Sequence, residues 1–450
     1  MSAAVTALNS PPPRGGRDYR TNLACMAIGI MAQLNYGFDL PSVAVLRSLC
    51  RRLRGTRVNI DALCIAYDHL RRAAMGAIYA NTVRTLSFTL YCPSSTIPAE
   101  YKNIEAIDVG SNSMLSEWFL DSIPPSCRRL SIKGRMTRSA IDRLCRRGNL
   151  QRLTSLMLCT LPLIVVPVGV KFGAPLLEVL ELVGVAPDFS FVVAFDGLVS
   201  LAVEGLDNYT VGEIVARLPP SLRSLAISVS DVSDETLGPV VNTRLTHLRL
   251  QRCSGLTVNV IHSLPESLEA LHLEDLVSMV DELGVPTDPM TANLTGLISL
   301  KSLAVINVPI IYYIIYLPAS LKALKIVKFR WGGRNSMYMG GGSMFGLLPR
   351  GLTSLYFEAE VWNFDTVLLH TTIEDLTIRC VYLYHLPGII TECLPPTLTR
   401  LDVSNSVIPW GDITVFAGLK GLDTLVLGDK HRTPPDVMAV LRSSIPRVVG

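Results

Sequence analysis

A ten-residue pattern that begins with Leu-Pro returns several times along this chain. Residues 218–227 read Leu-Pro-Pro-Ser-Leu-Arg-Ser-Leu-Ala-Ile, and residues 264–273 and 317–326 repeat them with few changes. Shorter copies follow Leu348-Pro349 and Leu394-Pro395, and an earlier one begins at Ile123-Pro124. A Leu-x-x-Leu-x-Leu core with a period of about 20 to 30 residues predicts a solenoid, in which each unit packs against its neighbours.

The first apolar residue of each core, here called the anchor, can be followed through most of the chain. The anchors are Val83, Ile104, Cys127, Leu153, Leu177, Leu198, Leu222, Leu245, Leu268, Leu300, Leu321, Leu352, Ile373, Leu398 and Leu422. In each core the last two apolar residues are two apart, so both point to one face of a short strand. We therefore predict about 15 stacked units over residues 81–433.

This pattern resembles the leucine-rich-repeat family, and the Leu-Pro lead-in resembles the variant found in bacterial effectors and many protist proteins. The resemblance implies an α/β solenoid, a horseshoe with a parallel concave sheet and a mostly irregular convex side. It also implies a binding surface and no reaction. The family's Asn or Cys eight residues after the anchor is found only at Asn112 and Cys253. In other units that position holds Leu206, Leu276, Val308 or Phe329, where we expect apolar packing instead.

The flanking segments differ from the repeats. Residues 1–21 contain Pro11-Pro12-Pro13 and Gly15-Gly16, a composition typical of a disordered tail. Residues 22–80 have helical periodicity, with the last apolar stripe at Ile60, Leu63, Cys64 and Tyr67. They form either a helical cap over the first strand or an F-box, which Leu40-Pro41 and Leu63 to Arg72 resemble. Residues 434–450 begin with Pro434-Pro435-Asp436 and predict a short helix in a C-terminal cap.

Composition narrows the possible functions. A net charge of +3 disfavours nucleic acid as the partner, and ten scattered cysteines without a Cys-x-x-Cys pair disfavour zinc and redox sites. The apolar run 23–34 is shorter than the roughly 20 residues that a membrane helix needs. No phosphate-binding loop, nucleophile elbow or His-Glu-x-x-His pair occurs, so we expect neither catalysis nor a cofactor. The expected compartment is the cytoplasm, with the mitochondrion as the alternative.

Side chains two, four and six residues after each anchor should point away from the core onto the concave sheet. Charged and aromatic groups are typical of protein-binding surfaces. The candidates on the sheet are His247, Arg249, Gln251, His272, Glu274, Lys325, Tyr356, Glu358, Arg379, Arg400 and Asp402. A long insertion adds Arg330, Trp331 and Arg334 as loop candidates. We expect no metal site, because His247, His272 and Glu274 lack a further well-placed ligand.

The sequence thus predicts an intracellular scaffold that binds another protein through its concave face. Two alternatives stay open. One is an F-box-type substrate receptor of a ubiquitin ligase, and the other is a structural subunit of a large assembly.

Overall fold

The computed structural model consists of two units, Met1–Leu198 and Val199–Gly450, each built from short parallel strands. The structure describes residues 62–65, 84–88, 97, 101–115, 117–137, 139–140, 143–144, 150–165, 173–186, 195–229, 231–276, 293–308, 316–329, 348–363, 371–384, 394–404, 406, 413–428 and 433–449. Within these ranges, none of the helices has the length and apolar character that a bilayer crossing requires.

The first unit is a parallel stack with one short described helix, α5 (Glu117–Asp121). Its strands are β1 (Ala62–Ile65), β2 (Thr85–Phe88), β3 (Ala106–Met114), β4 (Arg129–Arg135), β5 (Ser155–Val165) and β6 (Val179–Ala186). Each strand pairs with the next in chain order. Phe88 and Phe119 of α5 meet edge to face in its core, with ring centroids 5.4 Å apart.

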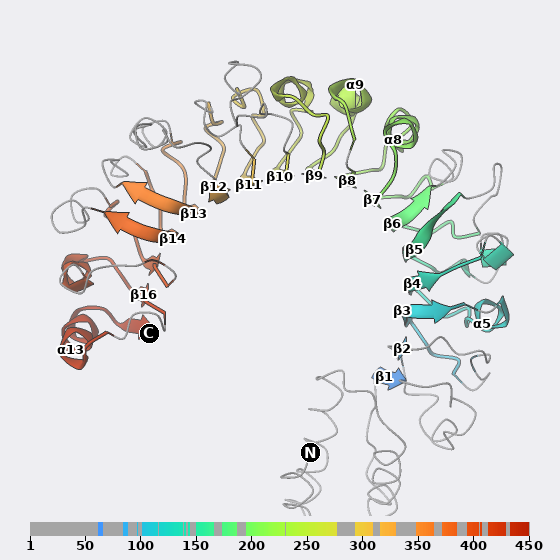
Figure 1. The fold of residues 1–450 in the computed structure, drawn as a ribbon, viewed down its shortest axis with the longest axis horizontal. Coiled ribbons are helices and arrows are strands. Elements are labelled where there is room, and N and C mark those ends of the chain that lie inside the picture. Colours follow the sequence, from blue (N-terminus) through green and yellow to red (C-terminus); the bar gives the residue numbers. More distant parts are fainter. Residues whose placement is uncertain are drawn as a thin grey trace, which may run out of the picture. The chain divides into compact units, whose positions relative to one another are not determined.

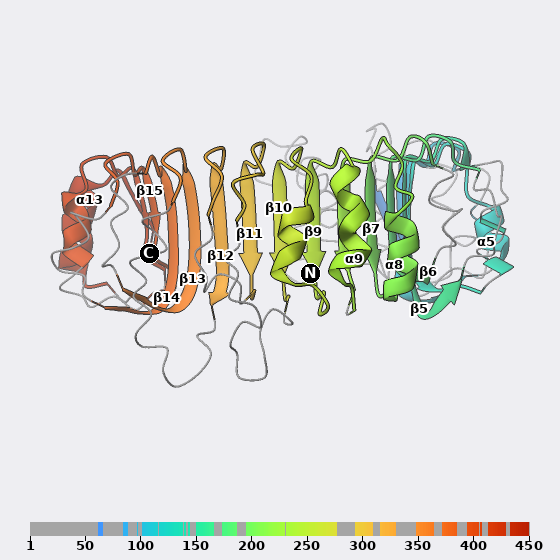
Figure 2. The same ribbon diagram turned by 90° about the horizontal axis from the view of Figure 1, so that it is seen from above.

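The second unit continues the same plan with strands that lie side by side in chain order (Figure 2). They are β7 (Ser200–Glu204), β8 (Ser224–Ser228), β9 (His247–Gln251), β10 (Ala270–Glu274), β11 (Ser302–Ile306), β12 (Ala323–Phe329), β13 (Ser354–Asn363), β14 (Asp375–Tyr384), β15 (Arg400–Asp402), β16 (Thr424–Val426) and β17 (Arg447–Val449). All the described pairings are parallel.

The anchors predict these strands. Each anchor from Val83 to Leu422 is followed two residues later by the first residue of a strand, from β2 to β16 in turn. The leucines three residues after the anchors form one column across the second unit and are at most 4% exposed. The column runs through Leu201, Leu225, Leu248, Leu271, Leu303, Leu324, Leu355, Leu376, Leu401 and Leu425. Burying each such side chain stabilises the stack by about 1.5–3 kcal/mol.

The Leu-Pro lead-in forms the turn before β8, β10, β12, β13 and β15. The carbonyl of Pro265 accepts a hydrogen bond from the backbone N–H of the anchor Leu268 at 3.1 Å, and Pro219, Pro318, Pro349 and Pro395 do the same for their anchors. The hydroxyl just before the anchor then links units: Ser267 Oγ donates to the Leu245 carbonyl at 2.7 Å. The same contact recurs from Ser126, Ser320 and Thr397.

The turns after β7, β9, β10 and β11 pack by apolar contact, as the sequence predicts. The prediction is wrong for Phe329, because β12 is longer and Phe329 is its last residue. Leu206, Leu276 and Val308, at the eighth position, are at most 5% exposed, and Cys253 is fully buried. The residue before them adopts left-handed backbone, with φ of 55° at Arg252 and 54° at Asn307. Asn307 Nδ2 donates to Asp275 Oδ1 at 2.6 Å, so a polar contact links two of these turns.

Short helices cover the outer side of the second unit, while its strands line the inner side (Figure 1). They are α8 (Asn208–Val215), α9 (Asp234–Leu237) and the 3₁₀ turns η2 (Gly238–Asn242), η3 (Val258–Ser263) and η7 (Thr414–Gly418). Asp207 caps α8 by accepting from the Thr210 N–H, which satisfies one of the helix's orphan donors.

The flanking segments were predicted less well. The helical interpretation of residues 60–67 is wrong at β1, because Ala62–Ile65 is a strand that pairs with Thr85–Phe88. The rest of 22–80, its F-box resemblance and the tail 1–21 lie outside the described residues. At the other end, α13 (Pro435–Ser444) begins at the expected proline pair, and β17 then pairs with β16.

Candidate functional site

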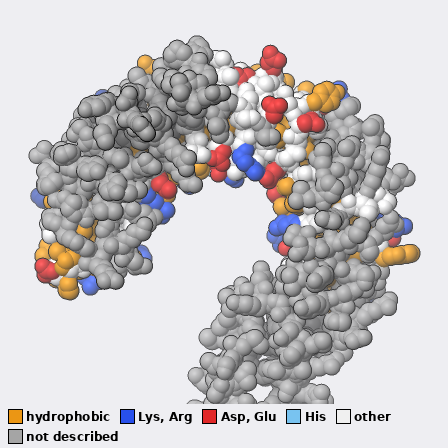
Figure 3. All heavy atoms as spheres, viewed as in Figure 1, with side chains coloured by type: hydrophobic (Ala, Val, Ile, Leu, Met, Phe, Trp, Pro, Cys, Tyr) orange, Lys and Arg blue, Asp and Glu red, His pale blue; other side chains and the backbone are white. Residues whose placement is uncertain are grey.

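The candidate site is the inner strand face of the second unit, defined as the side chains two, four and six residues after each anchor. Burial alternates along these strands. In β9, His247 and Arg249 are exposed while Leu248 and Leu250 are buried. Charged side chains of both signs lie on this inner side (Figure 3). All eleven predicted sheet candidates belong to this unit, and nine of them form three groups.

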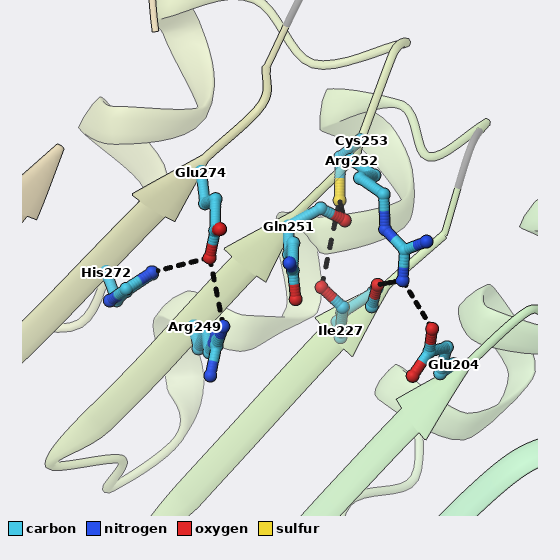
Figure 4. Close-up of polar contacts among 9 residues, drawn as sticks. Glu204, Ile227, Arg249, Gln251, Arg252, Cys253, His272 and Glu274 are labelled. Atoms are coloured by element: carbon cyan, nitrogen blue, oxygen red, sulfur yellow. Dashed lines mark hydrogen bonds and ion pairs between the residues drawn. The ribbon is translucent and has the colours of Figure 1, made fainter. Parts of the chain in front are cut away.

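The first group joins β9 and β10. Their register places Arg249 opposite His272 and Gln251 opposite Glu274. Arg249 Nη2 and His272 Nε2 each donate to Glu274 Oε2 at 2.9 Å, so one carboxylate oxygen holds two side chains (Figure 4). Burial tends to raise the pKa of the Glu274 carboxyl, but the hydrogen bonds from His272 and Arg249 outweigh it and leave the pKa below its usual value.

Arg252 extends this group across two further strands. Its left-handed backbone, φ 55°, turns the side chain back over the sheet. There it donates to Ser228 Oγ at 2.8 Å and pairs with the Glu204 carboxylate (Figure 4). The spacing predicts that Glu204, six residues after the anchor Leu198, lies on this face. It does not predict Arg252, which falls one position beyond the alternation. The following Cys253, at the family's turn position, is the signal that the strand has already ended.

The second group surrounds Tyr356 on β13. Lys325 Nζ lies 5.1 Å from the centroid of the Tyr356 ring, and the Arg379 guanidinium lies 5.4 Å from it. The Tyr356 hydroxyl donates to Glu358 Oε2 at 2.8 Å. Burial, together with this acceptor, raises the pKa of the phenol to about 12. The tyrosine therefore stays neutral at physiological pH.

The third group is centred on Arg400 of β15. Its guanidinium donates to Asp375 Oδ1 on β14 at 2.9 Å and lies 3.3 Å from Asp402 Oδ2. Asp402 is only 7% exposed and also accepts from the Ser404 N–H at 3.0 Å. Asp375 completes this group, and its position two residues after the anchor Ile373 predicts that it lies on the same strand face.

The remaining candidates stand apart. His247 is exposed and shares a 2.9 Å hydrogen bond with Thr246, while Gln251 is half-buried beside Ser228 and Glu274. The loop candidates Arg330, Trp331 and Arg334 lie outside the described residues. In the part of the chain that the structure describes, no three His, Cys, Asp or Glu side chains are arranged to hold a metal ion.

Three features together identify the fold: an apolar anchor in each repeat, a strand that begins two residues after it, and parallel, in-register pairing of successive strands. The chain has the leucine-rich-repeat fold. No family model matches the chain, and no curated protein sequence matches it.

Several solved structures are similar in backbone. One is the TLR13–ssRNA13 complex, at 14% identity and TM-score 0.40, covering 77% of this chain and 59% of that one. Another is the circular leucine-rich-repeat protein CroV588, at 16% and 0.38, covering 77% and 53%. A third is the internalin InlF of Listeria monocytogenes, at 14% and 0.28, covering 80% and 86%. The chain thus spans less than two thirds of the first two proteins.

Proposed function

We propose that the inner strand face of this leucine-rich-repeat protein binds another protein. Arginine and tyrosine contribute disproportionately to protein–protein binding. Arg249 lies on β9, and Tyr356 and Arg379 lie on the paired strands β13 and β14 of the same strand face. Arg249 is exposed, and Tyr356 and Arg379 are half-buried.

The observation that supports this proposal best is that long arginine side chains on this face are already held in place by ion pairs when no partner is bound. Arg249, Arg252 and Arg400 are each held by a carboxylate that comes from another strand. Ordering flexible side chains on binding costs about 0.5–1.5 kcal/mol each. Side chains already held in place avoid part of that cost, so the sheet is suited to recognition.

The test is a comparison of inner-face and outer-side variants of the full-length protein. Arg249→Ala with His272→Ala removes two inner-face groups. Tyr209→Ala removes an aromatic side chain of α8 that is 77% exposed on the outer side. The proteins would be used as baits with cross-linking and mass spectrometry, after nuclease treatment to remove nucleic acid. We expect a protein that cross-links to inner-face peptides to be lost with the double variant and kept with Tyr209→Ala. The opposite pattern, or cross-links confined to the outer side, would refute the proposal.

A further inference from the structure

The arginines of the inner strand face differ in how their charges are neutralised. Arg249, Arg252 and Arg400 each form an ion pair with a described carboxylate. Lys325 and Arg379 form none with any carboxylate of the described residues, and both lie against Tyr356 instead. The positive charges of Lys325 and Arg379 are therefore not neutralised by ion pairs with described residues on this face.

The arrangement around Tyr356 explains why Arg379 has no carboxylate. Glu358 lies directly opposite Arg379 in the register of β13 and β14. Its carboxylate accepts from the Tyr356 hydroxyl at 2.8 Å, and the Arg379 guanidinium lies over the Tyr356 ring. Arg379 Nε is buried and has no hydrogen-bond partner. A guanidinium donates through five N–H groups. Apart from its interaction with the Tyr356 hydroxyl, the Arg379 guanidinium is paired with no carboxylate of the described residues, so the donors at its outer nitrogens can serve a ligand.

We infer that Lys325, Tyr356 and Arg379 form a receptor for a carboxylate side chain, and that the protein partner presents an acidic segment here. The inference rests on the proposed function of the inner strand face. An aspartate or glutamate of the partner would accept from Lys325 Nζ and the Arg379 guanidinium while its methylene groups contact the Tyr356 ring. Hydrogen bonds between ionised groups are shorter and stronger than neutral ones.

The local charge favours a carboxylate over a phosphate. Two cations and the Glu358 carboxylate leave one positive charge around Tyr356, which one carboxylate neutralises. The neighbouring Asp375 and Asp402 share the single Arg400, so this group carries one net negative charge and further disfavours a doubly charged ligand. A phosphorylated side chain brings about −1.5 to −2 charges at neutral pH, which exceeds what these groups balance.

The test uses full-length protein and a fluorescein-labelled Gly-Glu-Gly-Glu-Gly-Glu peptide, with binding followed by fluorescence anisotropy at low ionic strength. Peptides with Gln or phosphoserine in place of Glu are the matched probes. The test variant is Lys325→Gln with Arg379→Gln. The control is Arg217→Gln with Arg442→Gln, which removes the same charge from exposed positions on α8's C-terminal side and α13.

We expect the Glu peptide to bind the wild type and the control about tenfold or more tightly than the test variant, as loss of a charge-assisted hydrogen bond implies. The Gln peptide should bind weakly to all three proteins. Equal binding of the Glu peptide to test and control variants would overturn the inference, as would tighter binding of the phosphoserine peptide. If the cross-linked partner persists with Lys325→Gln and Arg379→Gln, the carboxylate receptor fails while the proposed function stands.

Discussion

Leu225 on β8 and Leu248 on β9 lie directly side by side across two parallel strands, and they are 1% and 2% exposed. Each belongs to a different repeat, 23 residues apart in the chain. Because neither repeat can bury its own leucine, the stability of one unit depends on the presence of the next. A substitution at such a position should therefore lower the stability of both neighbouring units.

Truncating Leu248 should destabilise the repeat array strongly. Leu248→Ala removes buried methyl groups and leaves a cavity between Leu225 and Leu271, at an expected cost of about 2–5 kcal/mol in the free energy of unfolding. Leu248→Asp should cost more, because it buries a charge without a partner. Urea denaturation followed by circular dichroism measures both.

The adjacent residue is the control. His247 is exposed on the inner strand face, so His247→Ala should change the unfolding free energy by no more than about 0.5 kcal/mol. Wild-type melting of Leu248→Asp would show that the assigned register is wrong.

The sequence predicts the repeats well because two constraints agree. The spacing of the anchors fixes where strands begin, and the period of two within a strand fixes which side chains are buried. The spacing did not distinguish a helix from a strand at β1. Ile60 and Leu63 are three residues apart, which is the spacing of apolar residues on one face of a helix and also the spacing between an anchor and the next leucine of a repeat. The added Ile65 and the 23-residue distance from Ile60 to Val83 are the features that favour a strand.

The candidate site was predicted as a face and not as a set of contacts. Alternation identifies Arg249 and Glu274 as neighbours on one face, and the structure joins them. It does not identify Arg252, because its partner Glu204 is 48 residues away and the contact depends on a left-handed backbone angle. Rotamers and such turns are set by packing, which a repeat spacing does not specify.

Two glycines in the second unit should respond in opposite ways to alanine. A methyl group on Gly255 would lie 2.7 Å from the Val232 carbonyl oxygen, whereas one on Gly212 of α8 would meet only the Thr236 methyl group, at an ordinary contact distance of 3.6 Å. Gly255→Ala should therefore cost about 1–3 kcal/mol through overpacking. Gly212→Ala should be neutral or stabilise by up to about 1 kcal/mol, because alanine has a higher helix propensity than glycine inside α8. Chemical denaturation of the two variants checks this ordering, and a reversed order would contradict the close approach at Gly255.

The serine of the Leu-Pro-x-Ser lead-in should contribute through its hydroxyl. Ser267 Oγ donates to the Leu245 carbonyl of the preceding unit at 2.7 Å, so Ser267→Ala leaves that carbonyl without this donor. The expected loss is about 1 kcal/mol of unfolding free energy. Glu266→Ala, at the exposed neighbouring position, should be nearly silent. Equal effects of the two substitutions in thermal melts would argue against a role for this inter-unit contact.

Stability at alkaline pH should depend on the anchor Cys127. Burial, only partly offset by a backbone hydrogen bond at Arg129, raises the pKa of this thiol from 9.0 to about 12. Between these values the unfolded chain loses the proton while the native chain keeps it, so the free energy of unfolding falls as pH rises. In Cys127→Ala this contribution is absent. The difference in unfolding free energy between wild type and variant should be constant below pH 8 and shrink from about pH 9 upward. Urea denaturation over a pH series measures it, and a difference that stays constant throughout would show that the native thiol ionises as readily as the unfolded one.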